Sequence, residues 1–329
     1  MFAKYKKKIL LSVAFGAIVF LGFSIFADFD KLLKAFGEFN WYYFPVILAL
    51  SFGNYILRFY KWEYYRKIIG INLTQKISLL IFMATFVMSV TPGKMGELLK
   101  SYLVREECGT PVSKSAPIIL AERLTDFISV VVLCITGAFV FDYGKEVIFG
   151  VGIFFISGVI LISSRKISIS IIRKLEKVKL LSKVAHKFEE AYESIYLLVK
   201  IKPLIVATLI SGMAWFMECI GLYVVLKVYS SSTQIDVSLL SSVFIYGFST
   251  IIGSIAMLPG GLGVTEASIT GLLVLLKIPK DISVASTFII RVATLWFAVI
   301  IGIAAVYFYQ KHSSRELEEI GDSGELPKY

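Results

Sequence analysis

Metal-binding and disulfide-forming side chains are scarce in this sequence. It has three cysteines (Cys108, Cys134 and Cys219) and two histidines (His186 and His312), and no C-x-x-C or H-x-x-x-H spacing joins any of them. Zinc sites, haem sites and disulfide frameworks need such clusters. We therefore predict no metal site and no cofactor, and we expect the cysteines to be ordinary buried thiols.

Nucleotide and catalytic motifs are also missing. The chain has neither G-x-G-x-x-G nor G-x-x-x-x-G-K-[ST], and its glycine-rich run at 260–263 lies in an apolar context unsuited to a phosphate loop. No Ser–His–acid or Cys–His set is visible. An enzyme that uses Glu122 or Asp126 as a base on a lipid headgroup stays open as an alternative.

Apolar residues, by contrast, are abundant. They make up 57% of the 329 residues, and the mean hydropathy is +0.78. A soluble domain is nearer 45–50% apolar, so the composition predicts an integral membrane protein. The net charge of +10 comes from basic residues between the apolar stretches. That placement indicates membrane orientation and gives no reason to expect nucleic acid as a partner.

The apolar stretches predict an all-α membrane protein with about six full transmembrane helices. About 20 apolar residues cross the hydrocarbon core. We interpret the first stretch as a retained span, because it is longer than the apolar region of a signal peptide and no clear cleavage site follows. The candidates are 9–26, 41–57, 115–140, 147–163, 203–229 and 283–310.

Two further regions, 77–104 and 238–276, each contain two apolar arms around a Pro-Gly break. We predict that both are re-entrant helical hairpins; arms that cross fully are the alternative. With hairpins, 24 of the 34 lysines and arginines lie on the expected cytoplasmic side and five on the outer side, which predicts cytoplasmic N- and C-termini.

The two hairpins then enter from opposite sides of the membrane. Pro92 precedes Arg123 by 31 positions, and Pro259 precedes Arg291 by 32. This matched spacing predicts an inverted repeat within one polytopic membrane domain, with halves at about 41–140 and 203–310. Broken helices in corresponding positions of two halves are typical of a transporter's substrate site.

Two remaining segments are more polar. Apolar residues at steps of three and four, with lysines between them, predict an amphipathic helix over about 165–200. It would lie on the inner leaflet, either as a lipid-surface sensor or as a link that anchors the two halves. We expect the charged tail, 311–329, to be frayed.

Charged residues at membrane depth are costly and usually face a cavity or a partner. Glu122, Arg123 and Asp126 can share one face of the 115–140 helix. They form either a structural ion-pair cluster or an anion-binding guanidinium held by its neighbouring acids. Arg291 has no acid one turn away, so its protein partner must come from another helix, with Glu266 and Glu218 as candidates. Because guanidinium binds phosphate bidentately, Arg291 is the strongest single candidate for a phosphate ligand.

The Pro-Gly breaks add a second source of positive potential. Pro92 and Pro259 end the incoming arms, and Gly93, Gly260 and Gly261 permit the turns. The outgoing arms would point free backbone N–H groups into the membrane interior, where they attract anions.

Three charged side chains accompany these breaks. Glu97 and Glu266 lie in the first turn of the outgoing arms, where they either cap the helix or bind the ligand. Lys94 either recruits headgroups or extends its amine to the membrane surface.

These residues resemble the transmembrane region of the lysylphosphatidylglycerol synthase family, a group of flippase-like integral membrane proteins. The resemblance covers about 40–310 and rests on three motifs and Arg291, the motifs being Pro92-Gly93-Lys94-Met95-Gly96-Glu97 with Lys100, Glu122-Arg123-Leu124-Thr125-Asp126 and Pro259-Gly260-Gly261-Leu262-Gly263-Val264-Thr265-Glu266. It implies a membrane domain that handles lipids. The chain lacks the soluble aminoacyl-transferase domain of the full synthases, so we do not expect it to make lysyl-lipid alone.

We therefore expect flippase-like translocation of an anionic or zwitterionic lipid, either a phospholipid or a polyprenyl-phosphate lipid, across the cell membrane. The phosphate would bind near the midplane at Arg123, Arg291 and the hairpin tips. A membrane enzyme that transfers a group to or from a lipid headgroup is the alternative. A third hypothesis is an accessory subunit of a glycolipid pathway, with a lipid-modifying enzyme or glycosyltransferase as partner.

Overall fold

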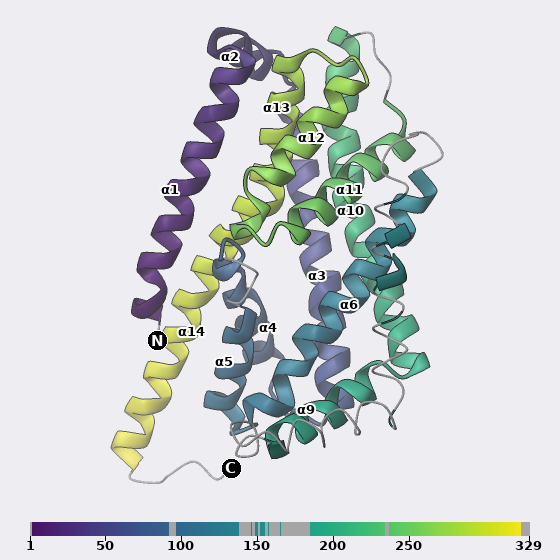
Figure 1. Cartoon of the computed structure of the whole chain (residues 1–329). Helices are drawn as coiled ribbons and strands as arrows, with labels where there is room; N and C mark the ends of the chain where they lie inside the picture. Colours follow the sequence, from purple (N-terminus) through teal and green to yellow (C-terminus); the bar gives the residue numbers. More distant parts are fainter. Residues whose placement is uncertain are drawn as a thin grey trace.

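The chain folds as a bundle of helices (Figure 1). The computed structural model describes residues 2–91, 97–137, 146, 149–150, 152–154, 157, 165, 185–233 and 237–323, and no strand occurs among them. The helices of ten or more residues are α1 (Phe2–Ala27), α2 (Phe29–Glu38), α3 (Phe44–Ile68), α4 (Gln75–Ala84), α5 (Leu98–Cys108), α6 (Val112–Gly137), α9 (Ala185–Leu198), α10 (Ile201–Thr233), α11 (Leu239–Ile255), α12 (Val264–Leu275), α13 (Lys280–Arg291) and α14 (Phe297–Ser323). Shorter turns are the 3₁₀ segments η1 (Trp41–Tyr43), η2 (Thr85–Met88) and η5 (Pro259–Gly261), and the π-helical segment η6 (Val292–Trp296).

The all-α prediction is confirmed, whereas the number of spanning helices stays a prediction. In the described part of the chain, two helical stretches are long and apolar enough to cross a membrane, Ile201–Ser230 and Lys280–His312. The second runs from α13 through η6 into α14. The expected span at 147–163 lies mostly outside the described residues.

Helix α3 is longer than the predicted span at 41–57. It continues to Ile68, so Arg58, Lys61 and Arg66 belong to the helix and not to a loop. Lys61 is only 1% exposed. The hydropathy pattern ended too early because a buried lysine with a partner lowers the average as much as a solvated one does.

The two regions with Pro-Gly breaks form two pairs of short helices. In Figure 1, α4 and α5 lie in the half of the bundle that holds the start of α1 and the end of α14, whereas α12 lies in the other half. The turn between α11 and α12 needs glycine, because Gly260, Gly261 and Gly263 all have positive φ (60°, 68° and 86°). The corresponding turn at 92–96, with Pro92, Gly93 and Lys94, lies outside the described residues.

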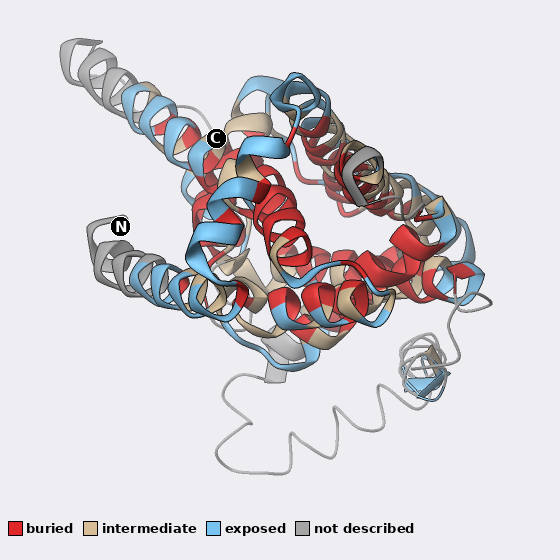
Figure 2. Cartoon of the chain, turned by 90° about the horizontal axis from the view of Figure 1, so that it is seen from above, coloured by how far each residue is buried: buried red, intermediate tan, exposed pale blue. Residues whose placement is uncertain are grey.

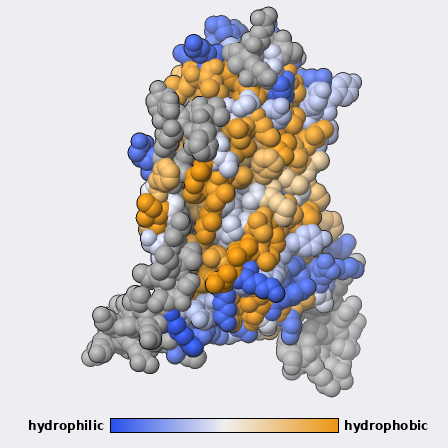
Figure 3. Space-filling view, turned by 90° about the vertical axis from the view of Figure 1, so that its right-hand side faces the viewer, coloured by the Kyte–Doolittle hydropathy of each residue, from blue (hydrophilic) through white to orange (hydrophobic). Residues whose placement is uncertain are grey.

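The outer surface of the bundle is apolar around its middle. Viewed along the bundle, buried residues lie on the inward helix faces and exposed ones on the outward faces (Figure 2). Figure 3 shows hydrophobic residues over the middle of one face and hydrophilic residues gathered near its two ends. Leu209 on α10 and Ile300 on α14 are each 63% exposed. A surface of this kind suits a lipid environment.

The polar segments differ in part from expectation. Within the predicted amphipathic helix at 165–200, the structure describes Arg165 and α9. The apolar side chains Tyr192, Ile195 and Leu198 of α9 are buried in the protein core, and α9 packs against α6. This face of α9 is therefore not available to lipid. The tail predicted to fray is helical as far as Ser323.

Candidate functional site

A cavity of about 650 Å³ lies inside the bundle, between the two pairs of short helices. Aromatic side chains (Phe82, Phe86, Phe127 and Trp215) cover much of its wall. Charged and hydroxyl groups from both halves of the sequence interrupt this apolar lining. Most ligand sites have this composition, an apolar wall with a few polar groups that orient the ligand.

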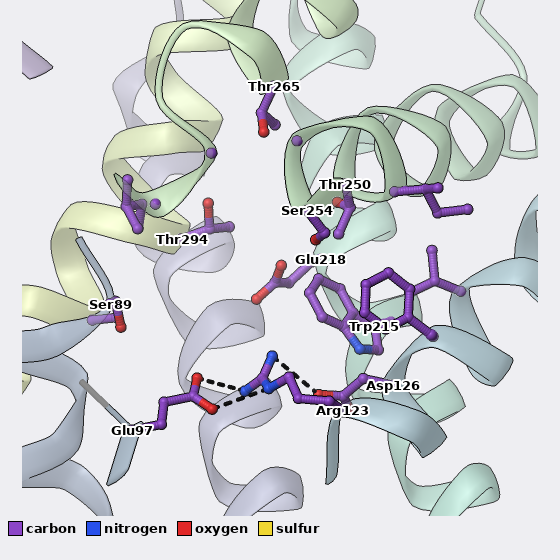
Figure 4. A pocket seen from close by; sticks show the side chains of 18 of the residues that line it. Ser89, Glu97, Arg123, Asp126, Trp215, Glu218, Thr250, Ser254, Thr265 and Thr294 are labelled. Atoms are coloured by element: carbon purple, nitrogen blue, oxygen red, sulfur yellow. Dashed lines mark hydrogen bonds and ion pairs between the residues drawn. The ribbon is translucent and has the colours of Figure 1, made fainter. Parts of the chain in front are cut away.

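Arg123 lies at one end of this cavity, bound by a carboxylate from another element (Figure 4). Its Nε donates to Glu97 Oε2 at 3.0 Å, and its Nη2 donates to Glu97 Oε1 at 2.6 Å. Its Nη1 is 3.6 Å from Asp126 Oδ2. The prediction that Arg123 relies on its two neighbours in α6 is therefore wrong in part, because Glu97 is its main partner and Glu122 pairs elsewhere.

Two buried lysines hold the acids that were expected to serve Arg123. Lys61 Nζ is 2.5 Å from Asp126 Oδ1 and also donates to Ser211 on α10. Lys100 Nζ is 2.9 Å from Glu122 Oε2 and lies 4.6 Å from the centre of the Trp62 ring. The sequence did not lead us to predict that either lysine is buried.

A sequence signal for Lys61 existed but is weak. Tyr55, Arg58 and Lys61 recur at three-residue spacing, which places them on one face of a helix that continues beyond the apolar stretch.

Arg291 also lines the cavity and has an acidic partner. Its Nε donates to Glu266 Oε1 at 2.6 Å, and its Nη2 donates to the carbonyl oxygen of Gly260 at 2.7 Å. Of the two candidate partners, Glu266 is confirmed. The other oxygen of Glu266 accepts the backbone N–H of Gly263 at 2.7 Å, so Glu266 caps α12. This carboxylate occupies part of the N-terminal position at which a free anion was expected.

The helix that carries Arg291 changes its winding directly after this residue. Val292–Trp296 forms a π-helical turn, a feature common at functional sites because it redirects side chains. The hydroxyl of Tyr55 on α3 donates to the carbonyl oxygen of Thr294 within this turn, at 2.6 Å. Tyr55 therefore satisfies a carbonyl group in the irregular segment.

The wall also presents uncharged polar groups and the acid Glu218 (Figure 4). The hydroxyl of Tyr246 donates to Glu218 Oε2 at 2.5 Å, and Arg291 is paired with Glu266 instead. The indole Nε1 of Trp215 is buried and has no hydrogen-bond acceptor in the described part of the structure. The serine and threonine residues that line the cavity are Thr85, Ser89, Thr250, Ser254, Thr265 and Thr294.

The structure brings together most of the predicted site residues that it describes. Those that line the cavity are Glu97, Arg123, Asp126, Glu218, Gly260, Gly261 and Arg291. Glu122 and Glu266 are buried beside the cavity, where each forms an ion pair with a lining residue, Lys100 and Arg291 respectively. Pro259 lies in the η5 turn. Whether any of them binds a substrate stays a prediction.

The apolar surface, the all-helical fold and the cavity define a helical membrane protein with a largely apolar internal cavity that carries a few charged groups. The chain belongs to the lysylphosphatidylglycerol synthase TM region family, whose signature matches residues 9–302. The expected family is thereby confirmed.

Two archaeal proteins are among its relatives. The chain is similar to a UPF0104 membrane protein of Methanocaldococcus jannaschii, with 23% identity over 70% of this chain and 97% of that protein. It is also similar to a UPF0104 membrane protein of Methanothermobacter thermautotrophicus, with 23% identity over 93% of this chain and 94% of that protein.

Proposed function

We propose that the protein moves an anionic or zwitterionic lipid across the membrane, with the headgroup passing through the internal cavity. The observation that carries this proposal is the chamber itself, which is large enough for a headgroup and is lined by the motifs of both halves. The charged and polar groups that interrupt its apolar wall lower the free-energy cost of moving a charged headgroup through the hydrocarbon core. The acyl chains would stay in the lipid outside.

A matched arrangement in the two halves supports an alternating-access mechanism. Glu97 directly precedes α5 and binds Arg123 on the next helix; Glu266 lies in the first turn of α12 and binds Arg291 on the next helix. We propose that α4/α5 and α11/α12 are re-entrant hairpins related by an inverted repeat. Relative rocking of the two halves would then open the cavity to each side in turn.

The sequence predicts that Arg123 and Arg291 bind the phosphate directly. In the conformation described, both guanidinium groups are bound to carboxylates. Direct binding therefore requires the headgroup to displace Glu97 or Glu266 during the transport cycle. Such an exchange of partners would couple headgroup binding to movement of the hairpins.

Reconstitution into liposomes tests the proposed function. Acyl-labelled fluorescent phosphatidylglycerol is placed in both leaflets, and a membrane-impermeant reductant quenches the outer leaflet. We expect protein-containing liposomes to lose nearly all fluorescence, whereas protein-free liposomes lose about half. If wild-type protein moves neither this probe nor a labelled polyprenyl phosphate, the proposal is rejected. Mass analysis of the recovered lipid tests the enzyme alternative, which requires a chemically altered headgroup.

A further inference from the structure

Arg58 differs from the other cations that line the cavity. Arg123, Arg291 and Lys100 each have a carboxylate partner. Half-buried Arg58 lines the same cavity, and no hydrogen bond or ion pair joins its side chain to any other described residue. Four acids in or beside the cavity, Glu97, Glu122, Asp126 and Glu266, already have cationic partners. Arg58 therefore has positive charge to offer a ligand.

Trp215 on α10 offers a second unmatched donor to the cavity. Trp215 lines the cavity wall, and its indole N–H is buried and lacks an acceptor in the described part of the chain. A buried donor without an acceptor is rare, because such a group has lost its hydrogen bond to water. An indole N–H can only donate. A ligand oxygen that accepts a hydrogen bond would therefore satisfy this N–H group.

Contacts between α3 and α10 place these two donors at the same level of the bundle. Asn54 Nδ2 donates to the carbonyl oxygen of Ala214 at 2.8 Å, and Lys61 Nζ donates to Ser211 Oγ at 2.7 Å. Arg58 lies between Asn54 and Lys61 on α3, and Trp215 directly follows Ala214 on α10. The same stretch of helix contact therefore carries both donors.

We infer that Arg58 and Trp215 form the contact for the phosphate group of a ligand in the cavity. Two donors with no acceptor of their own among the described residues match the phosphate oxygens, and Arg58 supplies the charge. Arginine suits this role, since its planar fork presents several N–H groups to one phosphate. The aromatic wall strengthens the attraction by excluding water. This inference rests on the proposed function for its choice of a lipid phosphate over free phosphate.

Binding of acyl-labelled fluorescent phosphatidylglycerol to the detergent-solubilised full chain tests the inference, with fluorescence anisotropy as the readout. We expect Arg58→Gln to weaken binding at least about tenfold and Trp215→Phe a few-fold, in line with the loss of a charged and a neutral hydrogen bond. Arg58→Lys should fall between wild type and Arg58→Gln. Arg105→Gln, which removes an exposed arginine of α5 away from the cavity, is the matched control and should bind as wild type.

Two further arms separate binding from folding and lipid phosphate from free phosphate. Labelled diacylglycerol, which has no phosphate, should bind wild type and Arg58→Gln equally. The thermal midpoint should fall less in Arg58→Gln than in Arg291→Gln, because no ion pair or hydrogen bond joins Arg58 to another described residue, whereas Arg291 is paired with Glu266. If Arg58→Gln does not fold, the weaker binding of phosphatidylglycerol expected for Arg58→Lys and Trp215→Phe tests the inference instead. Inorganic phosphate should compete weakly; strong binding of inorganic phosphate with none of phosphatidylglycerol would overturn the lipid assignment.

The inference and the proposed function fail in different ways. Phosphatidylglycerol binding by Arg58→Gln at wild-type affinity overturns the inference, as does an equal loss of affinity for both labelled lipids. If wild-type protein binds phosphatidylglycerol through Arg58 but does not move it between leaflets, the proposed function fails and the inference stands.

Discussion

Four ion pairs around the cavity join side chains from different elements. Their basic members are Lys61, Lys100, Arg123 and Arg291, and each binds an acid that is distant in sequence. Each pair is mostly buried, so removing one member leaves an uncompensated charge in a poorly solvated place. The loss typically costs about 3–5 kcal/mol. These pairs therefore fix the positions of the helices that carry them.

Arg291→Gln should lower the thermal midpoint by several degrees, because it leaves the carboxylate of Glu266, which is 0% exposed, without its cationic partner. Combining Arg291→Met with Glu266→Met should recover part of the loss, as both charges are then absent. Thermal unfolding in detergent, followed by size-exclusion chromatography, measures both variants. Arg105→Gln is the exposed control. An unchanged midpoint for Arg291→Gln would contradict the role assigned to this pair.

The sequence pointed to both ion-paired arginines of the cavity but to the main partner of only one of them. Glu266 could be proposed for Arg291 because no local acid competed with it. For Arg123, the acids at 122 and 126 satisfied every local rule, so nothing in the sequence pointed to Glu97, which lies 26 residues earlier. Which acid binds which cation depends on how α3, α5 and α6 pack. Spacing along one helix holds no information on that packing.

At the scale of helices, close contacts explain why some glycines are needed. A Cβ atom at Gly302 of α14 would lie 2.3 Å from the backbone nitrogen of Val87 in η2. Backbone atoms cannot move aside as a side chain does. A Cβ at Gly271 of α12, by contrast, meets no atom within 4 Å. The two positions form a matched pair for substitution.

Gly302→Ala should destabilise the protein by about 1–3 kcal/mol through overpacking, despite the better helix propensity of alanine. Gly271→Ala should be neutral or stabilising by up to about 1 kcal/mol. Thermal midpoints of the two variants in the same detergent provide the comparison. Equal midpoints would show that α14 and η2 do not approach as closely as described.

The apolar pattern predicted where helices occur better than where they end. The spans predicted at 115–140 and 203–229 correspond to α6 and α10 with shifts of a few residues. Helix ends depend on local hydrogen bonds that hydropathy does not register. Helix α5, for example, ends at Cys108, because the next residue, Gly109, adopts a left-handed conformation with φ of 66°.

At the scale of the whole molecule, the arrangement of the helices bears on orientation. The start of α1 and the end of α14 lie at the same end of the bundle, and α2 lies at the opposite end (Figure 1). Exposed apolar side chains cover the middle. This arrangement agrees with two termini on one side of the membrane, and the excess of lysine and arginine predicts that this side is cytoplasmic.

Cysteine labelling tests this orientation. In a variant without native cysteines, Lys31→Cys on α2 should react with an impermeant maleimide in intact cells, because Lys31 is exposed at the end opposite the termini. Arg105→Cys on α5 should react only after permeabilisation. The reverse pattern would invert the proposed topology, and labelling of both sites in intact cells would contradict a transmembrane arrangement.

The π-helical turn at Val292–Trp296 determines how α13 is rotated about the helix axis relative to α14. Each residue of an α-helix rotates the chain by about 100° around the axis. If Val292–Trp296 were wound as an α-helix while α14 kept its position, these residues would turn the chain further around the axis, because a π-helical turn holds about one residue more than an α-helical turn. Arg291 would then rotate by roughly the step of one residue, about 100°, out of reach of Glu266. A change of winding, with no change of charge, would thus release this ion pair.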